Sequence, residues 1–160
     1  MATLYGDILR FAYHLGLAVI VGGGLALGAV AAPAIFRTMR ARGDAGIVFG
    51  AVLERFDGWA ILSLILVVVA SFLKAGAFEE DVRDPRILAR YGALALVAIA
   101  VLYGAAWANP VARAIRKQTP GFDDLPENDL RRREFRALHA RSARAFTLAV
   151  LFGALAIYLS

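Results

Sequence analysis

The chain has 160 residues, of which 60% are hydrophobic and 19% are charged; its mean hydropathy is +0.64 and its formal net charge is +5. Soluble domains are roughly half apolar and a quarter charged, so this composition argues against a soluble globular protein. The absence of cysteine excludes disulfides, thiolate metal sites and thiol catalysis. The basic residues flank apolar runs, which favours contact with lipid headgroups over nucleic acid.

Four apolar stretches are long enough to cross a bilayer, whose hydrocarbon core takes about 20 helical residues. We expect spans over about residues 9–34, 58–78, 88–110 and 138–160, with connections at residues 35–57 and 111–137 on one side. The expected fold class is all-α: an integral membrane four-transmembrane-helix bundle, up-down-up-down, in a single domain over residues 1–160.

The first span contains several glycines at helical spacing, two of them in a GxxxG element. In lipid, small residues let two helix backbones approach closely, so such a stripe predicts a packing seam. The seam belongs to the bundle itself, to a homodimer through the Gly24–Gly28 face, or to the path of a ligand. The glycines concerned are Gly16, Gly23, Gly24 and Gly28.

His14 is the one ionisable side chain well inside a predicted span, and Pro33 is expected to end or kink the same span. An ionisable group in the membrane is costly and is therefore a functional candidate. One interpretation is a neutral imidazole bonded to a neighbouring helix; the alternatives are haem, metal or proton transfer. His139 is expected at the opposite membrane surface as a solvated or lipid-contacting residue, which excludes one haem held by both histidines.

The connection after the first span is expected to form a short interfacial helix, capped by Asp44 and beginning at Ala45. The alternative is that this stretch extends the second span as a bent helix. At its end, Asp57 is expected to pair with an arginine of the third connection or the fourth helix, as charges near a membrane tend to find partners.

Asn109 and Pro110 are expected to end the third span, because proline stops a helix and asparagine can satisfy the freed backbone groups. The following Thr119-Pro120-Gly121 predicts a turn. A helix is then expected to start near residues 124–126 and to run on into the fourth span.

The loops differ sharply in their content of lysine and arginine. Of the 18 basic residues, 13 fall in the first and third connections and their flanks. The positive-inside rule places these connections in the cytoplasm, so both termini are expected on the outer side of the bacterial inner membrane.

Taken in order, these motifs resemble the transmembrane protein 205-like family, and the resemblance covers nearly the whole chain. It implies a four-helix membrane domain and carries over no catalytic residue and no metal ligand. The first span, through His14, also resembles that of membrane-embedded protoporphyrinogen oxidase and of copper-resistance membrane proteins. The residues that carry the main resemblance include Gly16, Gly23, Pro33, Arg55, Asp57, Trp59, Asn109, Pro110, His139 and Ser142.

The sequence contains no Ser/His/Asp arrangement, nucleotide fingerprint or convergent carboxylate pair. We therefore expect a non-enzymatic inner-membrane protein without a cofactor, with a structural, transport-associated or accessory role. Its expected partners are the lipid bilayer, a second copy or a membrane complex, and not nucleic acid. The alternative is a small haem- or copper-handling protein that uses His14.

Overall fold

The computed structural model describes residues 2–78 and 83–160, and every regular element within these ranges is a helix. The first half of the chain forms two long helical rods joined by a tight connection. The first rod is α1 (Ala2–Leu25), a π-helical segment η1 (Ala26–Ala31) and α2 (Ala32–Thr38), and the second rod is α3 (Arg42–Phe78).

The second half repeats this plan with a longer connection. The third rod ends at Gln118, and the connection turns at Gly121, whose left-handed φ of +63° glycine adopts without strain; a short 3₁₀ turn follows. The elements are α4 (Pro85–Val101), π-helical η2 (Leu102–Ala108), α5 (Asn109–Gln118), the 3₁₀ turn η3 (Phe122–Asp124) and α6 (Leu130–Tyr158).

Four helical rods of the described chain are long and apolar enough to cross a membrane, which makes this a membrane-type helical protein. At 1.5 Å per residue, the 37-residue α3 is about 55 Å long, against about 30 Å for a hydrocarbon core. A large part of α3 must therefore extend beyond the core. The position of the bilayer along the rods stays a prediction.

The π-helical segments both lie just before a proline that the rod passes through. Within η1 and η2 the backbone bonds reach five residues, from the Ala32 amide to Leu27 and from the Asn109 amide to Gly104. Proline has no N–H, so the carbonyl four residues before it has no backbone donor. A wider, π-helical turn lets the backbone continue its hydrogen bonding on either side of this missing bond. Neither helix ends at its proline, as was expected for Pro110 and as one of two outcomes for Pro33: both rods continue past these residues, with the regular α-helical bonding disturbed just before them.

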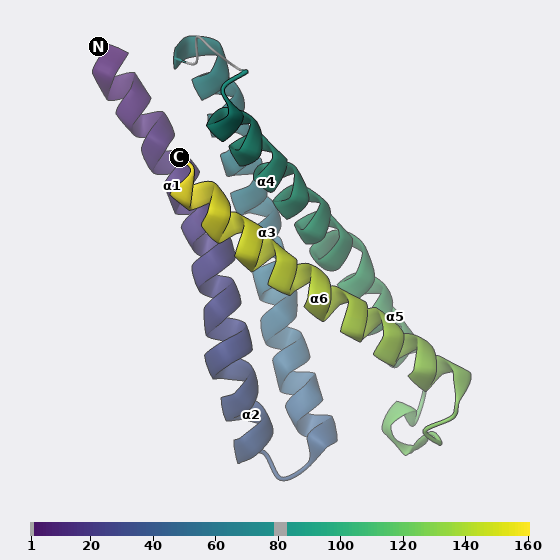
Figure 1. Ribbon diagram of the computed structural model, residues 1–160. Coiled ribbons are helices and arrows are strands. Elements are labelled where there is room, and N and C mark those ends of the chain that lie inside the picture. The colour runs from purple at the N-terminus through teal and green to yellow at the C-terminus, as the bar shows by residue number, and fades with distance from the viewer. Residues whose placement is uncertain (1, 79–82) are drawn as a thin grey trace.

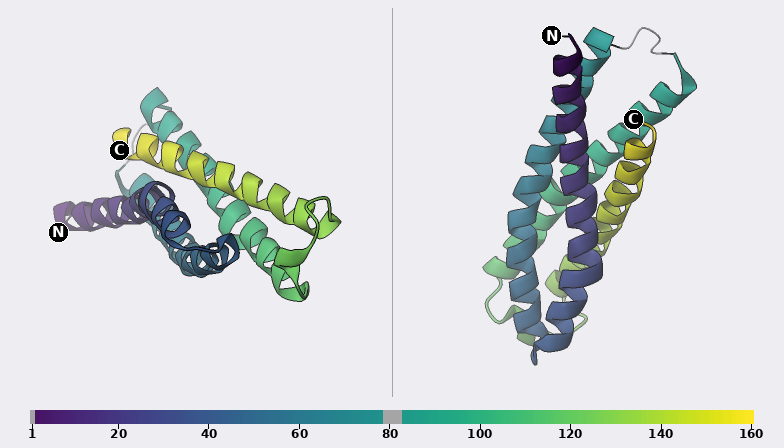
Figure 2. Two further views of the ribbon diagram at one scale, coloured as in Figure 1. Left: turned by 90° about the horizontal axis from the view of Figure 1, so that it is seen from below. Right: turned by 90° about the vertical axis from the view of Figure 1, so that its left-hand side faces the viewer.

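The rods associate as two pairs that diverge toward one end. α1 packs along α3, α4 packs along α6, and α1 also contacts α6. Figure 1 shows the chain running away from the N-terminus in α1 and α2, back in α3, away in α4 and α5, and back in α6. The pairs cross near the two termini and separate toward α2 and α5, as the view from below in Figure 2 also shows.

Small residues bring the rods close together where the pairs cross. A Cβ built on Gly16 would lie 2.8 Å from the carbonyl oxygen of Ser63 on α3, and one on Gly24 would lie 2.5 Å from Val150 on α6. Gly23 faces Phe56 in the same way, whereas Gly28 faces open space. Gly24 is thus already used within one chain, and a homodimer through the Gly24–Gly28 face stays a prediction.

Two connections differ from the sequence-based expectation. The predicted interfacial helix is not a separate element. Residues 42–57 instead form the first turns of α3, as the alternative interpretation had it, because the helix continues through Gly58 without a break. Asp44 lies in the first turn and does not cap the helix. The last helix begins later than expected, after Asp129, whose side chain accepts a hydrogen bond from the Arg131 amide.

Candidate functional site

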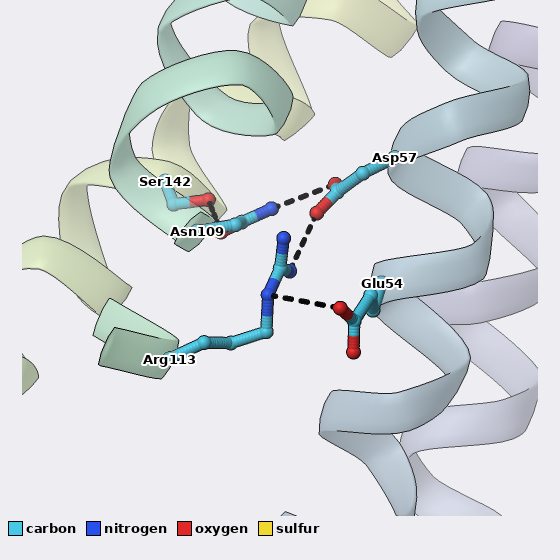
Figure 3. A network of polar contacts seen from close by, with 5 residues as sticks. All are labelled: Glu54, Asp57, Asn109, Arg113 and Ser142. Atoms are coloured by element: carbon cyan, nitrogen blue, oxygen red, sulfur yellow. Dashed lines mark hydrogen bonds and ion pairs between the residues drawn. The ribbon is translucent and has the colours of Figure 1, made fainter. Parts of the chain in front are cut away.

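A network of polar side chains joins three rods at the point where the two pairs separate. Asp57 comes from α3, Asn109 and Arg113 come from α5, and Ser142 comes from α6 (Figure 3). Asp57 and Ser142 are each 7% exposed. A buried carboxylate is stable only with partners, so these contacts fix how the three rods meet.

The hydrogen bonds of the network converge on the carboxylate of Asp57. The Ser142 hydroxyl donates to Oδ1 of Asn109, which orients the amide so that its Nδ2 donates to Asp57 Oδ1 at 2.8 Å. The second carboxylate oxygen of Asp57 accepts from the Arg113 guanidinium, also at 2.8 Å. Charge-assisted bonds of this kind are about twice as strong as neutral ones. We call Asp57, Asn109, Arg113 and Ser142 the polar latch.

The latch confirms one expectation and corrects another. Asp57 does pair with an arginine that follows the third span, and the arginine is Arg113. Asn109 was expected to satisfy freed backbone groups, but its side chain instead links Asp57 to Ser142. Arg55 and Trp59 flank Asp57 in the sequence, yet both are exposed and lie outside these contacts.

Below the latch, the diverging pairs leave an open groove of about 530 Å³. Small-molecule sites in proteins typically measure about 300–1,000 Å³, so the groove has the size of a ligand site. Asn109, Arg113 and Glu54 belong both to the latch region and to the groove wall. Glu54 lies 4.0 Å from Arg113 with 65% of its side chain exposed, so it sits at the rim.

One side of the groove is apolar. The walls come from the end of α2, the first half of α3, α5 and the start of α6, and Phe36 and Phe49 meet edge to face across the α2–α3 turn at 5.9 Å. His139 stacks on Phe135 with ring planes 1° apart. The apolar lining consists of Phe36, Ile47, Phe49, Leu53 and Phe135.

The other side of the groove is cationic. Arg113 is compensated by Asp57, and Arg116 donates two hydrogen bonds to Asp123, at 2.7 and 3.0 Å. Within the described chain, Arg42 and Lys117 lie beyond ion-pair distance of any carboxylate. The groove wall therefore holds four cationic side chains, Arg42, Arg113, Arg116 and Lys117, and one carboxylate, that of Glu54.

His14 lies in a different place, near the C-terminus of the chain. Its Nδ1 lies 2.8 Å from the Arg10 carbonyl oxygen, to which it donates, and its Nε2 lies 2.8 Å from the Ser160 hydroxyl. The neighbouring Tyr13 donates to the Ala156 carbonyl. His14 thus ties α1 to the end of α6, and an axial metal bond would require breaking its contact with Ser160.

The latch and the groove together supply hydrogen-bonding groups, positive charge and apolar surface. In residues 2–78 and 83–160, no three metal-ligating side chains gather in one place. The two histidines lie in separate regions, His14 against Ser160 and His139 in the groove wall. Binding of an amphiphilic molecule is the chemistry that these groups can perform together.

Sequence reasoning did not find the groove. Its apolar residues lie on four separate elements, and each looks like an ordinary membrane-facing or interfacial side chain when it is taken alone. A usable signal was the apolar face of residues 47–56 in a stretch outside the predicted second span. The groove exists because that face and α5 diverge, and only the tertiary structure shows this divergence.

Comparison with known proteins gives one match. A family model described as a domain of unknown function, DUF4149, matches residues 15–120, a segment that runs from α1 to the turn after α5 and contains most of the groove. No curated protein and no solved structure matches the chain.

Proposed function

The chain belongs to the DUF4149 family, and we propose that it is a non-enzymatic, multi-pass membrane protein that binds an amphiphilic molecule in the groove below the polar latch. In this proposal it serves a transport-associated or accessory role. The kinship with the transmembrane protein 205-like family, suggested by the order of motifs, is part of the same proposal.

We also propose the membrane and the orientation. The basic residues of the first and third connections favour the cytoplasmic side of a bacterial inner membrane for the end that carries the groove. The rods would then cross up-down-up-down, with both termini outside. Trp59 and Trp107, which are 62% and 49% exposed, suit the headgroup level near the upper end of the groove.

The observation that carries the proposal is the groove itself. A pocket with an apolar wall and a few converging polar groups is the usual form of a small-molecule site. Here the apolar wall and the cations face the same space, whose upper end is fixed by hydrogen bonds between three rods. A cofactor role for His14 has weaker support, because both ring nitrogens already have protein partners.

The proposal can be tested by filling the groove. Gly50 lines the groove and Gly92 does not, and a Cβ on either would meet no atom within 4 Å. In native mass spectrometry after mild-detergent extraction, we expect amphiphile adducts on the wild type and on Gly92→Trp, and their loss from Gly50→Trp. Equal adducts on both variants would exclude the groove as the binding site.

A further inference from the structure

We propose that the occupant of the groove is an anionic phospholipid of the cytoplasmic leaflet. Its phosphate contacts Arg42 and Lys117, and an acyl chain lies along the apolar lining of the groove. This inference rests on the proposed function and names the class of ligand. Three properties of the groove lead to it: its uncompensated charge, its apolar wall and its depth relative to the bilayer.

The first property is charge. Arg113 and Arg116 are held by Asp57 and Asp123, so their charges are largely balanced inside the protein. Arg42 and Lys117 are both exposed and, in the part of the chain that the structure describes, have no carboxylate partner. These two cations, one from α3 and one from α5, line the same groove and give it a positive charge complementary to a phosphate.

The second property is the apolar wall, which a free phosphate would leave uncovered. Phe36 is 46% exposed and Ile47 is 57% exposed, and both line the same space as the cations. Removing exposed apolar surface from water is favourable. An acyl chain that covers this wall while its headgroup meets Arg42 and Lys117 satisfies both halves of the groove.

The third property is depth. The groove uses α3 from Arg42 to Glu54, residues that precede the predicted second span, and α5 up to Lys117, which follows the predicted third span. If the spans lie as the sequence predicts, these segments extend beyond the hydrocarbon core, to the level of the headgroups. A groove at this level takes a lipid from the adjoining leaflet, and the positive-inside rule makes that leaflet cytoplasmic.

The test compares two lipids and free phosphate on the detergent-purified full chain. We expect phosphatidylglycerol to form an adduct in native mass spectrometry and to raise the melting temperature, as a ligand of the folded state must. Phosphatidylcholine, which has no net charge, and inorganic phosphate should do neither at the same concentration. Each cation near an anionic surface is worth several-fold in affinity, so Arg42→Gln/Lys117→Gln should weaken phosphatidylglycerol binding about 30-fold.

The matched control is Arg131→Gln/Arg133→Gln, which removes the same charge from exposed arginines of α6 outside the groove. It should weaken binding less than about threefold at physiological salt, where exposed charges are screened. An equal loss in both double variants, equal binding of both lipids, or an effect of phosphate alone would overturn the inference. Equal binding of both lipids that Gly50→Trp abolishes would overturn only the anionic class and leave the proposed function standing.

Discussion

At the scale of single residues, Asn109 is the centre of the structure, because its amide is the one group that both accepts and donates within the latch. Ser142 is bonded to its oxygen and Asp57 to its nitrogen, so the amide can be held in one orientation only. An aspartate at this position has no N–H for Asp57, and a leucine has neither group. The Asn109 side chain therefore contacts the other two rods of the latch at once.

The first prediction concerns the carboxylate of the latch. Asp57→Ala removes the acceptor of the Asn109 amide and the main partner of the half-buried Arg113 guanidinium, which costs about 1–3 kcal/mol. The free energy of unfolding, measured by titration with a denaturing detergent, should fall by this amount.

Glu54→Gln provides the control, because it removes a carboxylate three residues away that is mostly exposed and 4.0 Å from the same arginine. Exposed ion pairs contribute little, so we expect a loss of less than about 0.5 kcal/mol. Similar losses in the two variants would show that the latch does not hold the rods together.

The pairing of Asp57 was predictable and the role of Asn109 was not, for a physical reason. A carboxylate beside a membrane span needs a cation, and the third connection contains the nearest cluster of arginines, so Asp57 and Arg113 could be matched from charge alone. The contacts of a neutral amide depend on which way its helix is rotated. The π-helical η2 changes that rotation just before Asn109; Pro110 indicates that a backbone bond is lost there, but not how far the helix turns in response.

At the scale of elements, the glycines of α1 determine how closely the two helix pairs approach. Gly16 lies against the backbone of α3, whereas Gly22, less than two turns further along α1, faces open space. The sequence predicted a packing seam but not which glycines form it, because η1 and the crossing of the pairs decide which face of α1 is covered.

The second prediction compares these two positions. Gly16→Ala places a methyl group 2.8 Å from the Ser63 carbonyl oxygen and 2.6 Å from Val67, so the pair must separate, at a cost of about 1–3 kcal/mol. Gly22→Ala meets nothing and should gain up to about 1 kcal/mol from the better helix propensity of alanine. The melting temperature in detergent should move in opposite directions; a shift of the same sign in both variants would refute the close contact of α1 with α3.

The helices themselves were largely predictable, and their ends were not. Long uncharged runs fix where a rod must lie, because an unbonded backbone group in lipid is too costly for any other structure. The ends of the helices lie in the polar connections, where more than one residue can cap the start of a helix. Asp129 caps α6 in preference to the earlier Asp124 because Phe122 is buried in a 3₁₀ turn that holds residues 122–124 out of the helix.

At the scale of the whole molecule, the two diverging pairs give the protein one closed end and one open end. In Figure 1 the C-terminus lies where the pairs cross, whereas α2 and α5, whose residues line the groove, lie toward the end where the pairs diverge. The divergence is a property of the tertiary structure, so neither hydropathy nor charge counts could predict it. The orientation in the membrane that we propose from the charge distribution can be measured directly.

The third prediction concerns that orientation. The chain has no cysteine, so an introduced cysteine is a unique label. In bacteria with a permeabilised outer membrane, an impermeant maleimide should label Asp7→Cys, at an exposed position of α1, before lysis. Arg40→Cys and Asn128→Cys, at exposed positions of the first and third connections, should react only after lysis. The reverse pattern would place the groove outside the cell.

The position of Ser142 on the last helix bears on how the molecule is made. During translation α3 and α5 leave the ribosome before α6, so Asp57 and Arg113 can meet while the amide oxygen of Asn109 still lacks its hydroxyl donor. Tyr13 and His14 on α1 likewise form their hydrogen bonds to Ala156 and Ser160 only after α6 has been made. Insertion of the final helix is thus the step that supplies the last hydrogen-bond partners both to the latch and to the first helix.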